Sequence, residues 1–161
     1  MKQSNIIMNR FLLIVVLISF FNSCKTSKDI ANNKTDYVMF SLRKTECRGK
    51  CPVFFMEIFK SGIVVFEGVK NIDKIGKYEK TLSKKEIKNL QKSFDDFDFF
   101  SFENEYTGKI TDLPSTYISY TNNGQTKQIR DYFGAPEKLK ELEEILNEIA
   151  QSKDGWKKIV E

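Results

Sequence analysis

Histidine is absent from all 161 residues of this sequence. Because histidine is the commonest general base and a frequent zinc ligand, its absence argues against a catalytic triad and against a metal centre. The sequence also lacks a glycine-rich phosphate-binding loop, an internal repeat and the strand–helix alternation that builds parallel sheets. We therefore expect no metal and no cofactor.

Long apolar runs are missing too, since the most apolar stretch, Phe11 to Phe21, has about 11 residues. A transmembrane helix needs about 20, so this stretch is too short to cross a membrane as a helix. It follows Lys2 and Arg10, as the apolar region of a signal peptide does. Cys24 comes shortly afterwards, directly behind Ser23, in an arrangement that resembles a bacterial lipobox. We expect cleavage before Cys24 and lipidation of that cysteine, with an ordinary secretory signal or an uncleaved N-terminal anchor as alternatives.

The sequence predicts three parts: a signal peptide over residues 1–23, a polar tether over 24–36 and a single domain over 37–157. The first part holds two of the 26 basic residues and none of the 22 acidic ones, so cleavage leaves a formal charge of +2. Nucleic acid is therefore not an expected partner. We expect a protein of the cell envelope, exported and lipid-anchored to a membrane, either at the outer membrane or at a periplasmic face.

Segments rich in β-branched and aromatic residues predict five strands and a weaker sixth. They are Tyr37–Lys44, Val53–Phe59, Ile63–Phe66, the weaker Lys77–Leu82, Thr116–Thr121 and Thr126–Tyr132. A two-residue turn at Ser61-Gly62 and a turn at Asn122-Asn123-Gly124, which contains Asn-Gly, are typical of hairpins. The sequence thus predicts two hairpins with flanking strands.

Two amphipathic helices are expected as well. A capping box of Ser83 and Glu86 begins the first, which we expect to end near Phe94 or Asp95. The second is expected to begin at Pro136. Its apolar stripe consists of Leu139, Leu142, Ile145, Leu146 and Ile149. The element order β-β-β-(β)-α-β-β-α predicts an α+β domain, in which an antiparallel sheet packs against two helices.

Cys47 and Cys51 flank a short basic segment in TECRGKCPVF. A metal site needs three or four ligands, which this chain does not offer. A redox centre is a better alternative, because Arg48 and Lys50 would lower the pKa of a thiolate. Export, however, would bring the chain to a compartment where disulfides form. If Cys24 carries a lipid, Cys47 and Cys51 are the two remaining cysteines and can pair with each other. We favour a structural disulfide and keep thiol–disulfide exchange as the alternative.

The long connection between the two halves of the domain carries further candidates. Tyr106 and Asp112 of this connection, with Arg130 and Tyr132 of the second hairpin, are candidates for lining one groove between the two. We favour packed tyrosines and an ion pair between Arg130 and Asp112. The carboxylates of the connection would instead suit a hydrolase. They are Glu103, Glu105 and Asp112.

The stretch CRGKCPVFFMEIFKSGIVVFEG resembles the opening of an uncharacterised family of bacterial, often lipidated, domains with the pattern Cys-x-Gly-x-Cys-Pro-Val-Tyr. The likeness continues through Asp112-x-Pro114, Asp131-Tyr132 and Ala135-Pro136, and covers residues 37–157. Phe54 stands where tyrosine is usual, and Gly49 lies one place later than in the commonest spacing. The resemblance implies that the cysteine pair belongs to the fold of the family, and it implies no activity.

The preferred hypothesis is a membrane-tethered, non-enzymatic binding or structural lipoprotein domain. It would present residues 46–52 and 99–115 to an envelope protein, a glycan or another envelope ligand. The candidate binding surface consists of Arg48, Lys50, Tyr106, Asp112, Arg130 and Tyr132. The alternatives are a thiol–disulfide protein that uses Cys47 and Cys51, and a carboxylate hydrolase.

Overall fold

The computed structural model describes residues 36–160. The predicted signal peptide, the tether as far as Thr35 and the lipidation site Cys24 lie outside the described residues. None of the described helices is long and apolar enough to cross a membrane.

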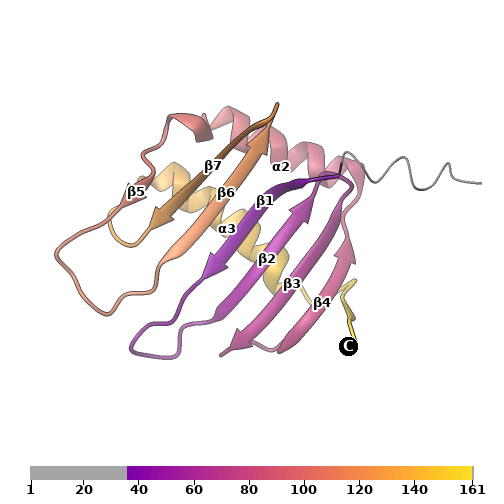
Figure 1. Ribbon diagram of the computed structural model, residues 1–161, viewed down its shortest axis with the longest axis horizontal. Helices are drawn as coiled ribbons and strands as arrows, with labels where there is room; N and C mark the ends of the chain where they lie inside the picture. Colours follow the sequence, from indigo (N-terminus) through magenta and orange to yellow (C-terminus); the bar gives the residue numbers. More distant parts are fainter. Residues whose placement is uncertain (1–35, 161) are drawn as a thin grey trace, which may run out of the picture. The chain divides into compact units, whose positions relative to one another are not determined.

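Within residues 36–160, eight strands form one sheet in the order β5-β7-β6-β1-β2-β3-β4-β8 (Figure 1). The strands are β1 (Val38–Lys44), β2 (Val53–Phe59), β3 (Ile63–Lys70), β4 (Gly76–Thr81), β5 (Glu105–Tyr106), β6 (Thr116–Asn122), β7 (Gln125–Asp131) and β8 (Lys157–Lys158). Neighbouring strands are antiparallel except β5 and β7, which are parallel. The sheet is therefore mixed, because its edge strand β5 is parallel to β7.

Helices α2 (Lys84–Asp96) and α3 (Glu137–Gln151) both lie on one face of the sheet, behind the strands in Figure 1. A short 3-10 helix, η3 (Phe99–Ser101), follows α2. The predicted capping box is present, with the Ser83 hydroxyl accepting from the Glu86 backbone and the Glu86 carboxylate accepting from the Ser83 backbone. The domain thus has two layers, and the described helices cover one face of its sheet.

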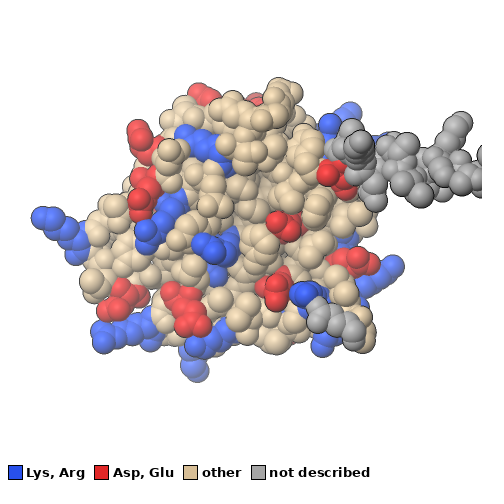
Figure 2. Space-filling view, in the orientation of Figure 1, with Lys and Arg blue, Asp and Glu red and all other residues tan. Residues whose placement is uncertain are grey.

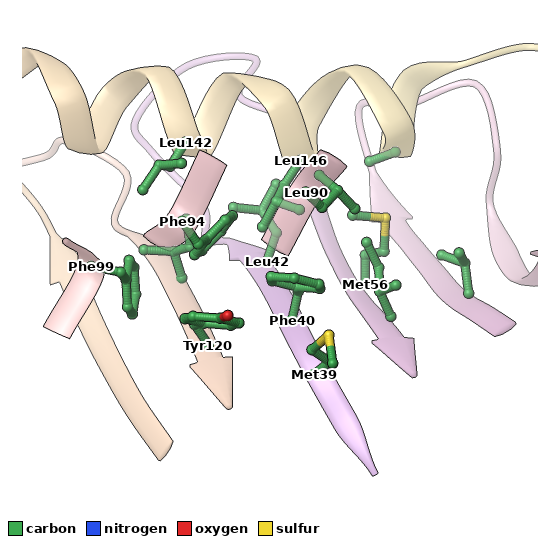
Figure 3. Close-up of a cluster of buried hydrophobic side chains, with 14 of the residues drawn as sticks. Met39, Phe40, Leu42, Met56, Leu90, Phe94, Phe99, Tyr120, Leu142 and Leu146 are labelled. Atoms are coloured by element: carbon green, nitrogen blue, oxygen red, sulfur yellow. The ribbon is translucent and has the colours of Figure 1, made fainter. Parts of the chain in front are cut away.

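Phe94 of α2 lies in an aromatic cluster between the helices and the sheet (Figure 3). The centroid of its ring is 4.8 Å from that of Phe40, 5.1 Å from that of Phe99 and 5.1 Å from that of Tyr120. All four side chains are fully buried. Burial of the Tyr120 hydroxyl, together with its hydrogen bond to Asp95, raises the pKa of this phenol. The cluster joins β1, β6, α2 and η3 into one core.

The two predicted hairpins form with different turns. The expected Asn-Gly turn is present, since Asn123 and Gly124 both have positive φ. Asn122, which was expected in the turn, pairs with Gln125 instead, so the turn has two residues. The first turn was expected to have two residues, and that prediction is wrong. The turn contains three residues, Lys60, Ser61 and Gly62. The backbone N–H of Gly62 donates to Phe59 O at 2.9 Å, and Gly62 itself adopts a positive φ of 95° before β3 begins.

The predicted α+β class is confirmed, but the order of elements differs from the prediction. The strands β5 and β8 and the helix η3 were not expected, and helix α3 begins at Glu137 with Pro136 as its N-cap. Helix α2 continues to Asp96, one residue beyond the expected end. Strands of two residues have no local sequence signal, because pairing with distant strands creates them.

Strand β3 also continues past its expected end at Glu67-Gly68. The strand runs to Lys70, and Gly68 lies within it at a closely packed position and does not form a turn. A Cβ atom at Gly68 would lie 1.7 Å from the carbonyl oxygen of Lys74, so only glycine fits here.

Candidate binding surface

Two loops lie side by side at one end of the sheet: residues 45–52, between β1 and β2, and residues 107–115, between β5 and β6 (Figure 1). The backbone N–H of Thr45 donates to Ser115 O at 3.0 Å, and the backbone N–H of Ser115 donates to the Thr45 hydroxyl at 2.8 Å. Arg48 forms an ion pair with Asp112 at 3.2 Å. We call these two loops, together with Tyr132 and Phe133, the tip.

The disulfide favoured from the sequence is present in the first of these loops, where it joins Cys47 to Cys51. The backbone N–H of Gly49 lies 3.2 Å from the Cys47 sulfur. The amide of Asn71, which follows β3, donates to Cys51 O at 3.0 Å. The loop is therefore fixed both within itself and against the neighbouring turn.

We expect a variant with both Cys47→Ser and Cys51→Ser to lose about 2 kcal/mol of its free energy of unfolding, because the disulfide closes a short loop. Urea denaturation followed by circular dichroism measures this loss. The wild type after reduction should show the same loss. A decrease of about 5 kcal/mol or more would contradict the interpretation, since that size belongs to a disulfide on which a whole small domain depends.

Tyr132 organises the second loop. Its hydroxyl donates to Ile110 O at 2.8 Å and accepts from the backbone N–H of Leu113 at 3.4 Å. Tyr106 fixes the backbone just before this loop in a similar way, because its hydroxyl accepts a hydrogen bond from the backbone N–H of Glu103 at 3.1 Å. Both tyrosines are half-buried, so each fixes backbone and is only partly available to a ligand.

The predicted ion pair between Arg130 and Asp112 is wrong. Arg130 instead pairs with Glu105 at 2.7 Å and donates from Nε to the Ser115 hydroxyl at 3.1 Å. The reason is the parallel pairing of β5 with β7, which puts Glu105 opposite Arg130. Asp112, further along the loop, meets Arg48 instead.

Two carboxylates of the long connection take part in ion pairs. Glu105 and Asp112 each have a separate arginine partner. In the described part of the chain, no group of three or more His, Cys, Asp or Glu side chains is arranged to hold a metal ion.

Three apolar side chains of the tip are exposed: Ile110 at 41%, Leu113 at 38% and Phe133 at 47%. The ring of Phe133 packs over Gly108, where a Cβ atom would lie 2.6 Å from it. Arg48, Lys50 and Lys109 of the same two loops are exposed as well. Sequence reasoning missed the three apolar residues, because nothing in their local pattern shows that the fold leaves them in solvent.

Glu143 of α3 lies next to the tip, on the side of the sheet that faces the helices. It is 9% exposed, and among the described residues its Oε1 atom has no hydrogen-bond partner. Burial raises the pKa of Glu143 from the usual 4.5 to about 8, and the charge of Asp131 adds to the rise, while Lys44 and Lys140 oppose it. Burial also raises the pKa of Asp131. Glu143 therefore keeps a proton at neutral pH.

The helical pattern could have identified Glu143. It follows Leu139 by four residues and precedes Leu146 by three, so it falls on the buried stripe of α3. The apolar stripe expected from the sequence did not include it.

The profile of a family described as "Domain of unknown function (DUF6438)" matches residues 38–150. The chain belongs to the DUF6438 family. The predicted membership of an uncharacterised family is thereby confirmed. The DUF6438 match begins at the first residue of β1 and ends within α3, so it contains both loops of the tip. No curated protein matches the chain.

Proposed function

We propose that this DUF6438 protein is a membrane-tethered, non-enzymatic binding domain of the cell envelope. Lipid on Cys24 would hold it to a membrane, and the tip would bind an envelope protein. The observation that carries the proposal is the group of exposed apolar side chains on a backbone that is already fixed.

Fixed loops bind at a lower cost than mobile ones, because less conformational entropy is lost when the partner arrives. The Cys47–Cys51 disulfide, the Thr45–Ser115 hydrogen bonds and the Arg48–Asp112 ion pair fix the backbone on both sides of the tip. Clustered apolar side chains with a polar rim are typical of protein-binding surfaces. The tip has this composition, with Ile110, Leu113 and Phe133 exposed in the same loops as Arg48 and two exposed lysines.

The position of Asp36 supports an outward-facing tip. Asp36 accepts a hydrogen bond from the backbone N–H of Ser61 at 2.9 Å, in the turn between β2 and β3. From there β1 runs for seven residues, or about 23 Å, towards the tip. The chain therefore enters the domain at the end of the sheet opposite the tip, and a tether at that end leaves the tip free for a partner.

Incorporation of a radioactive fatty acid tests the anchor. We expect the wild-type chain to be labelled and a Cys24→Ala variant to remain unlabelled. An unlabelled wild type would refute lipidation while leaving the binding role of the tip open.

Site-specific photo-crosslinking in intact cells tests the tip. A photo-reactive amino acid at Lys50 is expected to give a discrete protein adduct, whereas the same amino acid at Lys88, on the exposed side of α2, is expected to give none. Phe133→Ala should lower the adduct yield about tenfold, since exposed aromatic anchors contribute strongly to binding, with little change in stability. Equal yields from Lys50 and Lys88, or an adduct of glycan instead of protein, would overturn the proposed partner.

A further inference from the structure

The Cys47–Cys51 disulfide can be reached from solvent in the folded chain. Both cysteines are half-buried, and the three residues between them are exposed. A thiolate cannot approach a disulfide that is enclosed in a core, whereas a disulfide at the surface can exchange with the thiols of other molecules. The position of the pair in the tip therefore allows thiol–disulfide exchange without unfolding.

The two sulfur atoms of the disulfide have different surroundings. The backbone N–H of Gly49 donates to the sulfur of Cys47 at 3.2 Å. Among the described residues no donor contacts the sulfur of Cys51, and Pro52, which follows it, has no N–H. A hydrogen bond becomes stronger when its acceptor carries a negative charge. Once the disulfide is broken, a thiolate is therefore more stable at Cys47 than at Cys51.

Two basic residues between the cysteines favour a thiolate at either sulfur. Arg48 shares its charge with Asp112, whereas Lys50 forms no ion pair in the described part of the chain. Glu46, the acidic residue of the same loop, is offset by Lys70 at 3.8 Å. Figure 2 shows basic side chains that project into solvent at this end of the sheet, at the lower left, with acidic ones between them. The charges thus ease reduction of the pair, and the backbone hydrogen bond determines which sulfur leaves.

We propose that the Cys47–Cys51 pair is a site of thiol–disulfide exchange with an envelope protein that carries two thiols. A thiolate of that protein attacks the sulfur of Cys51. The electron pair of the broken bond remains on Cys47, because the more stable thiolate leaves faster. The attacking sulfur is then joined to Cys51 in a mixed disulfide.

A second thiol of the same protein completes the exchange. It loses its proton and attacks the first sulfur of its own chain, and the bond to Cys51 breaks with its electron pair on Cys51. Cys47 and Cys51 each take up one proton, and the other protein has given up two. The other protein loses two electrons and gains a disulfide, while the disulfide of this chain is reduced to a dithiol.

Reduction would loosen one side of the tip, and this one step rests on the proposed function. The disulfide holds the segment that carries Arg48, whose ion pair with Asp112 is exposed and therefore contributes little alone. The hydrogen bonds between Thr45 and Ser115 lie outside the ring and remain. The reduced chain thus stays folded with a less fixed tip, and it binds its partner more weakly because more conformational entropy is lost.

Tryptic peptide mapping of the full-length protein identifies the sulfur that is attacked. Trypsin cleaves after Arg48 and Lys50, so Cys47 and Cys51 fall into different peptides, 45–48 and 51–60. The oxidised protein is incubated with reduced glutathione as the attacking thiol, together with iodoacetamide, which alkylates the freed cysteine before the ring closes again. We expect glutathione on Cys51 about tenfold more often than on Cys47. An adduct mainly on Cys47, or no adduct, would overturn the proposal.

Alkylation of the reduced chain tests the part played by Gly49. At pH 6, iodoacetamide should modify Cys47 about tenfold faster than Cys51, because the thiolate is the reactive form. Gly49→Pro removes the N–H and should bring the two rates close together. Gly49→Ala keeps the N–H and should keep the difference, since its Cβ atom would lie at an ordinary 3.8 Å from the sulfur of Cys47. Equal rates in the wild type, or a difference that survives in Gly49→Pro, would contradict the assignment of Cys47.

Crosslinking from the other loop of the tip tests the regulation separately. A photo-reactive amino acid at Lys109 is expected to give about tenfold less protein adduct when Cys47 and Cys51 are both replaced by serine. An unchanged yield would overturn the regulation of the tip. A wild type without any adduct would overturn the proposed function instead, and the two peptide measurements, which use no partner of the tip, would still confirm or refute the exchange site.

Discussion

Replacing Phe94 by alanine is expected to lower the free energy of unfolding by about 4 kcal/mol, which is the usual loss for a fully buried phenylalanine. Its ring is 0% exposed and contacts aromatic rings from three other elements. Those neighbours are held by strands and by η3, so they cannot collapse fully into the space that the ring leaves. The loss therefore includes both the transfer free energy of the ring and the free energy of the remaining cavity.

Phe97, three residues later, provides the matched control. It is half-buried at the end of α2, and the same change there should cost about 1 kcal/mol, because less apolar area returns to water. Urea denaturation of both variants measures the difference. Equal losses at the two positions would show that the aromatic cluster is not the centre of the core.

The parts of the fold that the sequence predicts correctly are those with a local cause. The capping box at Ser83 and Glu86 and the turn at Asn123 and Gly124 depend on residues a few positions apart. Their physical chemistry is complete within a short segment. Strand β5 has no such cause, since it exists only through its pairing with β7.

The difference between local and distant causes also explains which features of the tip the sequence predicted correctly. The disulfide follows from counting the cysteines of a chain that is expected to be exported. The structure brings Arg48 and Asp112 into contact and keeps Lys50 on the same loop as Arg48. The partner of Arg130 could not be predicted, because it depends on which strand lies beside β7. The exposure of Phe133 depends in the same way on the course of a distant loop.

The apolar character of β2 and β3 contains information that the secondary structure alone does not use. The stretches VFFMEIF and IVVF predict strands correctly, and their outward residues also indicate a second covered face. The described helices cover only one face of the sheet.

Replacing Glu143 by glutamine is expected to stabilise the protein at alkaline pH and to have little effect in acid. The folded chain holds a proton on Glu143 up to a pKa of about 8, whereas the unfolded chain releases it near 4.5. Between these values the folded state binds more protons than the unfolded state, so wild-type stability falls as the pH rises. The loss is absent below about pH 4.5, grows by up to about 1.4 kcal/mol for each pH unit, and stops growing above about pH 8. Glutamine keeps the shape of the protonated side chain and removes this dependence.

Urea denaturation at pH 5 and at pH 8.5 measures the effect of Glu143→Gln. At pH 8.5 the variant should be more stable than the wild type by roughly 3 to 5 kcal/mol, and at pH 5 the two should nearly agree. Glu141→Gln, at an exposed position of the same helix, is the control and should change stability by less than about 0.5 kcal/mol at either pH. A pH-independent difference between Glu143→Gln and the wild type would show that the buried carboxyl is ionised throughout. In that case Lys44 and Lys140 would outweigh burial and the charge of Asp131, and α3 would be held to the end of the sheet by charge instead of by a retained proton.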